Sequence, residues 1–329
     1  MRRFILLFLF INFYKVAYNQ VIKGTVLDNE TKSPIGFACL YFSGTFSGTQ
    51  SDQNGNFEVD VSKNASIPLT ISAIGYYSST LTDFSTEKPH IVYLTPKTYQ
   101  LKEVSINAKS LARRREANLI SFKNVFLGTT YNARQCVILN ESDITFNYGS
   151  DKDTLKAFAS KPILINNRRL GYSITYYLDK FEYSRWGRTF LLQGNIKFNE
   201  DLNSDPIQKQ VFERRREDAY FGSRMHFFRA LWVNDLISEG FIVKAPSGVN
   251  LNDKDIVIQQ DSRRKFLKYP ENIDICYHTK IPISHIVFLK ERVYFDNSGY
   301  FDGLGISWEG EFARQRIGDL LPCEYYIKE

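Results

Sequence analysis

Methionine, cysteine and histidine are scarce in this 329-residue chain, which has 2 Met, 4 Cys and 4 His. The cysteines, Cys39, Cys136, Cys276 and Cys323, are far apart and form no CxxC pair, so the spacing of a compact zinc site is missing. Cys39 and Cys136 lie in apolar strand-like runs, where a thiol usually acts as a small buried hydrophobic group. We therefore predict no metal and no other cofactor, while the even number of cysteines leaves disulfides open.

Hydrolase motifs are also missing from the sequence. It contains no HExxH and no GxSxG. None of His90, His226, His278 and His285 is followed by Glu three residues later, as the HxxE pair of a zinc carboxypeptidase requires. A glycosidase pair is defined by the distance between two carboxylates, so the sequence neither selects nor dismisses one. These observations favour a non-enzymatic protein.

Long apolar runs are absent except at the N-terminus. Arg2 and Arg3 precede the apolar run 4–11, and Ala17 offers a small residue near a cleavage point. This order is typical of a secretory signal peptide, and the run is far shorter than the roughly 20 residues of a membrane-spanning helix. We predict a signal peptide at residues 1–19, export to the periplasm or the outer membrane, and no transmembrane helix in the mature chain.

The charge balance is nearly even. The formal charge of +6 falls by three when Arg2, Arg3 and Lys15 leave with the signal peptide. The basic clusters 113–115, 214–216 and 263–265 are short and flanked by acidic or apolar residues, as on a solvated helix or loop face. We therefore expect no nucleic-acid partner, because such a partner requires a concentrated basic face.

Aromatic residues are abundant, with 20 Tyr and 26 Phe, and favour strand-rich structure. From Val21 short alternating runs are separated by turn residues, which indicates a sandwich of small antiparallel strands. Asn54 and Gly55 predict a type I′ hairpin, since both residue types tolerate positive φ. Asp52, Asn54 and Asn56 superficially suggest a calcium loop, but Gly55 is misplaced for an EF-hand and a structural turn is favoured.

The runs GTVLD, PIGFACLYF, GTQSDQNGNFEV, LTISAIGYYS and VYLTP resemble the carboxypeptidase regulatory-like domain, a transthyretin-like sandwich found in envelope proteins of the Bacteroidota. The resemblance implies an all-β, Greek-key fold over residues 20–98 and no catalytic activity. We expect Phe57 and Ile74 to be buried, and Gly75 to allow a bend before Tyr76. The other framework positions that the resemblance implies are Gly24, Pro34, Ala38, Thr49, Asp52 and Gly55.

After this domain, residues 99–124 read as a linker with a helix over 109–122, and residues 125–329 as a strand-rich α+β domain. Its sequence is similar to an uncharacterised C-terminal region of the same class of envelope proteins, which implies no activity. One helix should begin after Asp205, the N-cap of a capping box with Gln208, and end near 220–222. A second should begin after Ser223 and end at Gly240.

The candidate site residues are Tyr220, Arg224, His226, Arg229 and Trp186. At the start of the second helix, Arg224 and the free backbone N–H groups suggest an anion or partner site, and surface charge around a buried stripe is the alternative. Trp186, between Arg185 and Arg188, suggests stacking on a sugar or on a partner's side chain, or simply a cap on the core. The His278 and His285 side chains read as structural.

Two functions stay open. The first is a non-enzymatic exported binding or interaction module with an envelope protein or a glycan as partner. The alternative is a hydrolase that acts on cell-wall or imported glycan through carboxylates in the second domain.

Overall fold

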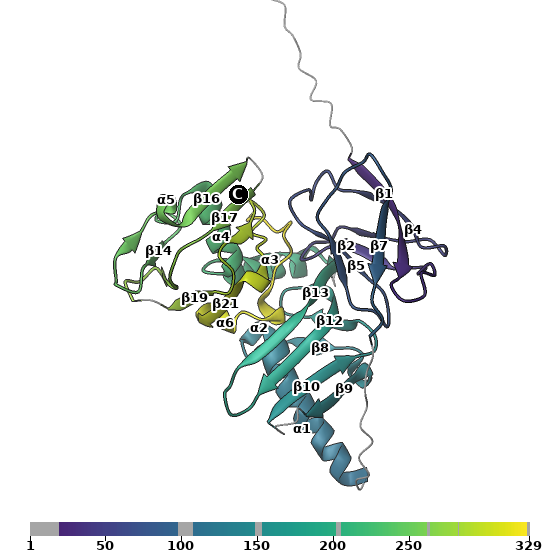
Figure 1. Cartoon of the computed structure of the whole chain (residues 1–329). Helices are drawn as coiled ribbons and strands as arrows, with labels where there is room; N and C mark the ends of the chain where they lie inside the picture. Colours follow the sequence, from purple (N-terminus) through teal and green to yellow (C-terminus); the bar gives the residue numbers. More distant parts are fainter. Residues whose placement is uncertain are drawn as a thin grey trace, which may run out of the picture.

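The computed structural model describes residues 20–97, 108–148, 153–201, 205–261, 264–281 and 283–327. The expected signal peptide lies outside these residues, as does the part of the expected linker before residue 108. Figure 1 shows the N-terminal sandwich beside the end of a large central sheet, with two smaller sheets on the other side of the molecule. Within the described residues no helix combines the length and the apolar character needed to cross a membrane.

The N-terminal domain is a β-sandwich, as the sequence predicted. Alternate residues of β1 are buried, as expected for a strand with one face on a core. Strand β1 pairs antiparallel with β4 and parallel with β7. The first sheet, in the order β4-β1-β7, contains β1 (Val21–Asp28), β4 (Asn56–Asp60) and β7 (His90–Leu94). The second, in the order β3-β2-β5-β6, contains β2 (Cys39–Phe42), β3 (Gly48–Gln50), β5 (Leu69–Ser72) and β6 (Ser79–Leu81).

Two expectations about the sandwich are wrong. Gly55 has φ +77° but Asn54 has no positive φ, so the turn is not type I′. It connects β3 in one sheet to β4 in the other and is closed by the Asp52 carboxylate, which accepts from the backbone N–H groups of Asn54 (2.9 Å) and Asn56 (2.8 Å). The Asp52 side chain thus has a structural role in closing this turn. Ile74 is 65% exposed, whereas Phe57 is buried as expected.

The central sheet has six strands and is covered on one face by a helix. Helix α1 (Ala108–Phe126) packs through Phe122 and Phe126 on Phe181 and Tyr176. Strand β12 is the longest strand of the sheet and pairs with three others. The sheet has the order β8-β11-β12-β10-β9 with β13 also on β12, and contains β8 (Cys136–Ile138), β9 (Ile144–Tyr148), β10 (Thr154–Ala159), β11 (Ile163–Asn167), β12 (Tyr172–Ser184) and β13 (Phe190–Asp201). The short helices α2 (Tyr131–Arg134) and η1 (Glu141–Asp143) precede β8 and β9.

Two helices follow the central sheet. Helix α3 (Pro206–Tyr220) begins after Asp205, whose side chain accepts from the Ile207 N–H. Helix α4 (Arg224–Val233) begins after the predicted cap Ser223, whose side chain accepts from the His226 N–H. It ends at Asn234 in the left-handed conformation, with φ 59°, and not at Gly240, because Asn also tolerates this conformation.

The two smaller sheets surround a separate hydrophobic core that includes Phe227, Phe228 and Leu231 of α4. One sheet has the order β15-β14-β18-β19-β21 and contains β14 (Phe241–Lys244), β15 (Asn250–Leu251), β18 (Ile273–Tyr277), β19 (Ser284–Phe288) and β21 (Ile306–Gly310). The other has the order β16-β17-β20 and contains β16 (Val257–Asp261), β17 (Arg264–Leu267) and β20 (Val293–Phe295). The short helices are α5 (Asp253–Ile256), η2 (Gly303–Gly305), α6 (Glu311–Arg314) and η3 (Ile317–Asp319).

The region after the linker therefore has two hydrophobic cores, one under the central sheet and one around the smaller sheets. The C-terminal residues Ile317, Leu321 and Tyr325 return to the core of the central sheet, while Cys323 joins the core of the sandwich. All four cysteines are free thiols, and Cys39, Cys276 and Cys323 are buried. The expected α+β character of this region is confirmed by the structure.

Candidate interaction surface

Three of the predicted site residues, Tyr220, His226 and Arg229, do lie together, but they are buried. Their exposed fractions are 8%, 1% and 9%. The Tyr220 ring lies 4.9 Å from the His226 ring, and the Arg229 guanidinium lies 5.4 Å from the Tyr220 ring centre. The prediction of a surface anion or partner patch is therefore wrong for these residues, because a partner in solution has no access to them.

The Arg229 guanidinium binds backbone carbonyls of the turn after β20 and of the C-terminal segment. Its Nε donates to Ser298 O (2.9 Å), Nη1 to Tyr325 O (2.7 Å) and Nη2 to Cys323 O (3.0 Å). A buried cation needs such acceptors to offset the loss of hydration. Arg229 thus fastens the C-terminal segment to α4, which is a structural role.

His226 is held as a neutral ring. Its Nδ1 accepts from the Gly222 backbone N–H (3.1 Å), so Nε2 carries the proton and donates to the Glu239 carboxylate (2.8 Å). Burial lowers the pKa of His226 more strongly than Glu239 raises it. The ring is therefore neutral near neutral pH and serves as a bridge between α4 and the following turn.

The N-terminus of α4 is already occupied by Gln315. The Arg224 backbone N–H donates to Gln315 Oε1 (3.0 Å), and Arg224 Nη2 donates to Gln315 O (2.6 Å). Burial lowers the pKa of Arg224 to about 10, and the positive charge of the nearby Arg316 is the second cause. A neutral amide oxygen takes the position predicted for an anion, so this part of the prediction is also wrong.

Trp186 lies in a different place, the turn between β12 and β13, and is 89% exposed. The turn is organised by Asp153, which accepts from the Trp186 backbone N–H (3.1 Å) and from the Ser184 hydroxyl (2.6 Å). The Ser184 hydroxyl oxygen also accepts from the Gly187 N–H (3.0 Å). The Trp186 side chain therefore does not cap the core. Its backbone is held by hydrogen bonds, and its ring is accessible to a partner.

Arg185 connects this turn to helix α1 through an aromatic ring. The Tyr148 ring lies 5.2 Å from the Arg185 guanidinium and 4.6 Å from that of Arg114 on α1. The Tyr148 hydroxyl (2.7 Å) and Arg185 Nη2 (3.0 Å) both donate to the buried Asn118 side chain. Arg114, Tyr148, Arg185 and Trp186 thus form one basic and aromatic surface, the hairpin-tip surface.

Sequence reasoning found Trp186 and Arg185 but missed Arg114 and Tyr148. Residues 114 and 148 are distant in the chain and meet only because α1 crosses the central sheet next to β9. Figure 1 shows the first turns of α1 projecting beyond the sheet, where residues 111–117 are exposed. The RRR run of residues 113–115 was the available signal, and its placement on a helix beside an aromatic strand could not be read from spacing alone.

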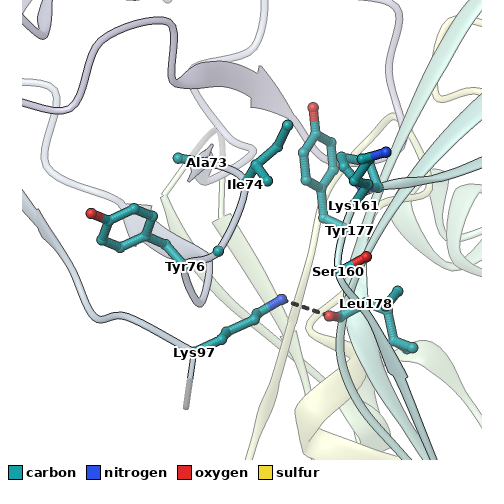
Figure 2. A pocket seen from close by; sticks show the side chains of 11 residues that line it. Ala73, Ile74, Tyr76, Lys97, Ser160, Lys161, Tyr177 and Leu178 are labelled. Atoms are coloured by element: carbon teal, nitrogen blue, oxygen red, sulfur yellow. Dashed lines mark hydrogen bonds between the residues drawn. The ribbon is translucent and has the colours of Figure 1, made fainter. Parts of the chain in front are cut away.

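The crevice between the sandwich and the central sheet is too small for a ligand (Figure 2). Its walls are Ala73 and Ile74 of the sandwich and Ser160 and Tyr177 of the sheet, and its volume is about 10 Å³, enough for one water molecule. Its lining has no carboxylate, so it offers no pair for the hydrolase alternative. The crevice therefore marks a packed contact between the two parts.

The described residues contain no group of three or more His, Cys, Asp or Glu side chains that could hold a metal ion. His285 Nδ1 instead lies 2.7 Å from the Asp274 carboxylate, between neighbouring strands β19 and β18.

A comparison with protein families decides the nature of the first domain. Residues 22–106 match the model of the CarboxypepD_reg-like domain. The N-terminal sandwich is a CarboxypepD_reg-like domain. The match to this domain confirms the predicted resemblance and extends past residue 98, into the expected linker. The region after the CarboxypepD_reg-like domain is not assigned to a family, and no curated protein matches the chain.

Proposed function

We propose that this chain is an exported, non-enzymatic binding protein of the cell envelope that contacts its partner through the hairpin-tip surface. The observation that carries the proposal is Trp186, which is 89% exposed on a turn fixed by Asp153. Exposing an indole to water is unfavourable, and Trp, Tyr and Arg are the residue types that dominate binding hot spots. A rigid backbone reduces the entropy lost on binding.

The N-terminal sequence supports the envelope location. Two arginines followed by the apolar run 4–11 are the arrangement of a cleavable export signal. Fractionation of cells should recover the protein from the envelope, with a mature N-terminus near Gln20. Recovery of the uncleaved chain from the cytoplasm would contradict this part of the proposal.

Photocrosslinking in the native envelope tests the binding surface. A photoreactive phenylalanine replaces Leu191, which is 37% exposed on β13 and follows the Trp186 turn in the chain, or the control residue Ile281, which is 73% exposed in another part of the molecule. We expect a reproducible adduct from position 191 that is absent from position 281. No adduct from position 191, or equal adducts from both positions, would overturn the proposal.

A further inference from the structure

We propose that the hairpin-tip surface binds an acidic glycan, with a sugar ring on Trp186 and its carboxylate or phosphate on Arg185 and Arg114. This inference rests on the proposed binding function and adds the chemistry of the ligand. The apolar part of the surface is a single indole with cations beside it. A sugar presents both an apolar face of C–H groups, which suits the electron-rich face of an aromatic ring, and a charged substituent at its edge.

The two arginines keep hydrogen-bond donors for an anion. Arg185 uses Nη2 for Asn118, which leaves other N–H groups of its guanidinium. Arg114 stacks on Tyr148 and, within the described residues, makes no hydrogen bond or ion pair. A planar guanidinium held on an aromatic ring is well suited to bind a carboxylate or phosphate with two parallel hydrogen bonds.

Three acidic side chains near this surface have partners. Asp153 holds the turn, Glu182 pairs with Lys156 (3.0 Å) and Lys180 (3.5 Å), and Glu141 pairs with Lys123. Within the described residues neither Arg114 nor Arg185 forms an ion pair with a carboxylate, so their positive charge favours an anionic ligand. A protein partner would need a larger desolvated apolar centre than one indole.

Calorimetric titration of the purified full chain tests the inference with four probes: oligogalacturonate, a mannose 6-phosphate oligosaccharide, neutral maltohexaose and oligoglutamate. We expect binding of one or both acidic sugars and at least about tenfold weaker binding of maltohexaose and oligoglutamate. Preference for the first or second probe distinguishes a carboxylate from a phosphate.

Trp186→Ala should weaken binding of the acidic sugar about tenfold, and Arg114→Gln with Arg185→Gln should abolish it. Trp186 is so exposed that its replacement leaves folding intact. The matched controls are Tyr131→Ala, which removes an exposed ring from under Arg169 (4.8 Å), and Arg314→Gln on the surface. Both should bind like the unchanged protein.

Failure of this inference differs from failure of the proposed function. Equal binding of oligoglutamate and acidic sugars, binding insensitive to Trp186→Ala, or no binding of any sugar would each overturn the acidic-glycan ligand. A protein adduct at position 191 would then leave the binding function standing with a protein as its partner. Absence of that adduct would remove the binding function itself.

Discussion

His226 shows how burial changes the meaning of a residue that the sequence singled out. Its position on α4 beside Arg224 and Arg229 looked like a cationic patch, whereas the folded chain surrounds the ring with Tyr220, Phe241 and the Glu239 carboxylate. The residue types and the helix could be predicted from sequence. The burial could not, because it depends on Phe241 and Tyr277 of strands that follow the helix, and because the neighbouring Arg229 binds carbonyls of the distant C-terminal segment.

The neutral state of His226 makes stability dependent on pH. Since burial lowers its pKa, the unfolded chain binds more protons than the folded chain once the pH falls below the ordinary value of about 6.5. The neutral His226 ring therefore contributes its full share to the free energy of unfolding above that pH. This share is lost as the pH falls towards the pKa of His226 in the folded chain. The free energy of unfolding from urea titrations at pH 7.5 and 5.5 should therefore decrease less in His226→Gln than in the unchanged protein. An identical decrease in both would contradict the assignment.

Among the elements, the hydrophobic alternation of β1 and the caps of α3 and α4 could be predicted because they depend on neighbouring residues. The turn at Gly55 could not be assigned to its sheets, because Asn-Gly has the same local preference in a hairpin and in a crossing between two sheets. The exposure of Ile74 also depends on its surroundings, since an apolar residue before a glycine bend looks the same in a core and in a surface loop.

Gly24 is required by the close pairing of β1 with β7. A Cβ atom at this position would lie 2.2 Å from the His90 backbone oxygen and 2.6 Å from the Phe57 ring. We expect Gly24→Ala to destabilise the sandwich by about 3 kcal/mol, since overpacking against backbone forces the strands apart. Hydrogen exchange followed by mass spectrometry should show the loss in β1, β4 and β7.

Gly75→Ala is the matched control for Gly24→Ala. Gly75 has φ +85° but no atom within 4 Å of an added Cβ, so only the backbone conformation is penalised, by roughly 1–2 kcal/mol. If Gly24→Ala cost no more than Gly75→Ala, the close approach of β1 and β7 would not be the reason for the glycine.

At the scale of the whole molecule, the sandwich is hydrogen-bonded into the rest of the chain. The Gly44 N–H donates to Ile196 O of β13 (2.8 Å), the Phe198 N–H donates to Thr45 O (3.0 Å), and the Cys323 N–H donates to Gly44 O (2.7 Å). The Tyr41 and Tyr177 rings stack 5.0 Å apart across the same contact. The sandwich is therefore packed firmly against the central sheet. The hairpin-tip surface lies on this same central sheet and its helix α1.

Lys97 and Asp179 form a largely buried ion pair between the sandwich and the central sheet. Lys97 Nζ lies 3.3 Å from the Asp179 carboxylate. It also donates to Leu178 O (2.7 Å), a bond drawn in Figure 2. The carboxylate also accepts from the Ser78 N–H (3.2 Å). The side chains are 9% and 20% exposed, and burial lowers the pKa of Lys97 more than Asp179 raises it.

Asp179→Ala should leave the Lys97 ammonium buried without its counter-charge, at a cost of about 3 kcal/mol. Because the loss falls on the contact between two cores, we expect thermal unfolding to change from one transition to two, with the sandwich unfolding first. Lys97→Met with Asp179→Leu removes both charges and should restore part of the stability, because no unpaired charge is left behind. If Asp179→Ala unfolded in one transition at an unchanged temperature, the ion pair would not couple the sandwich to the sheet, and the hydrogen bonds at Gly44 would hold the contact without it.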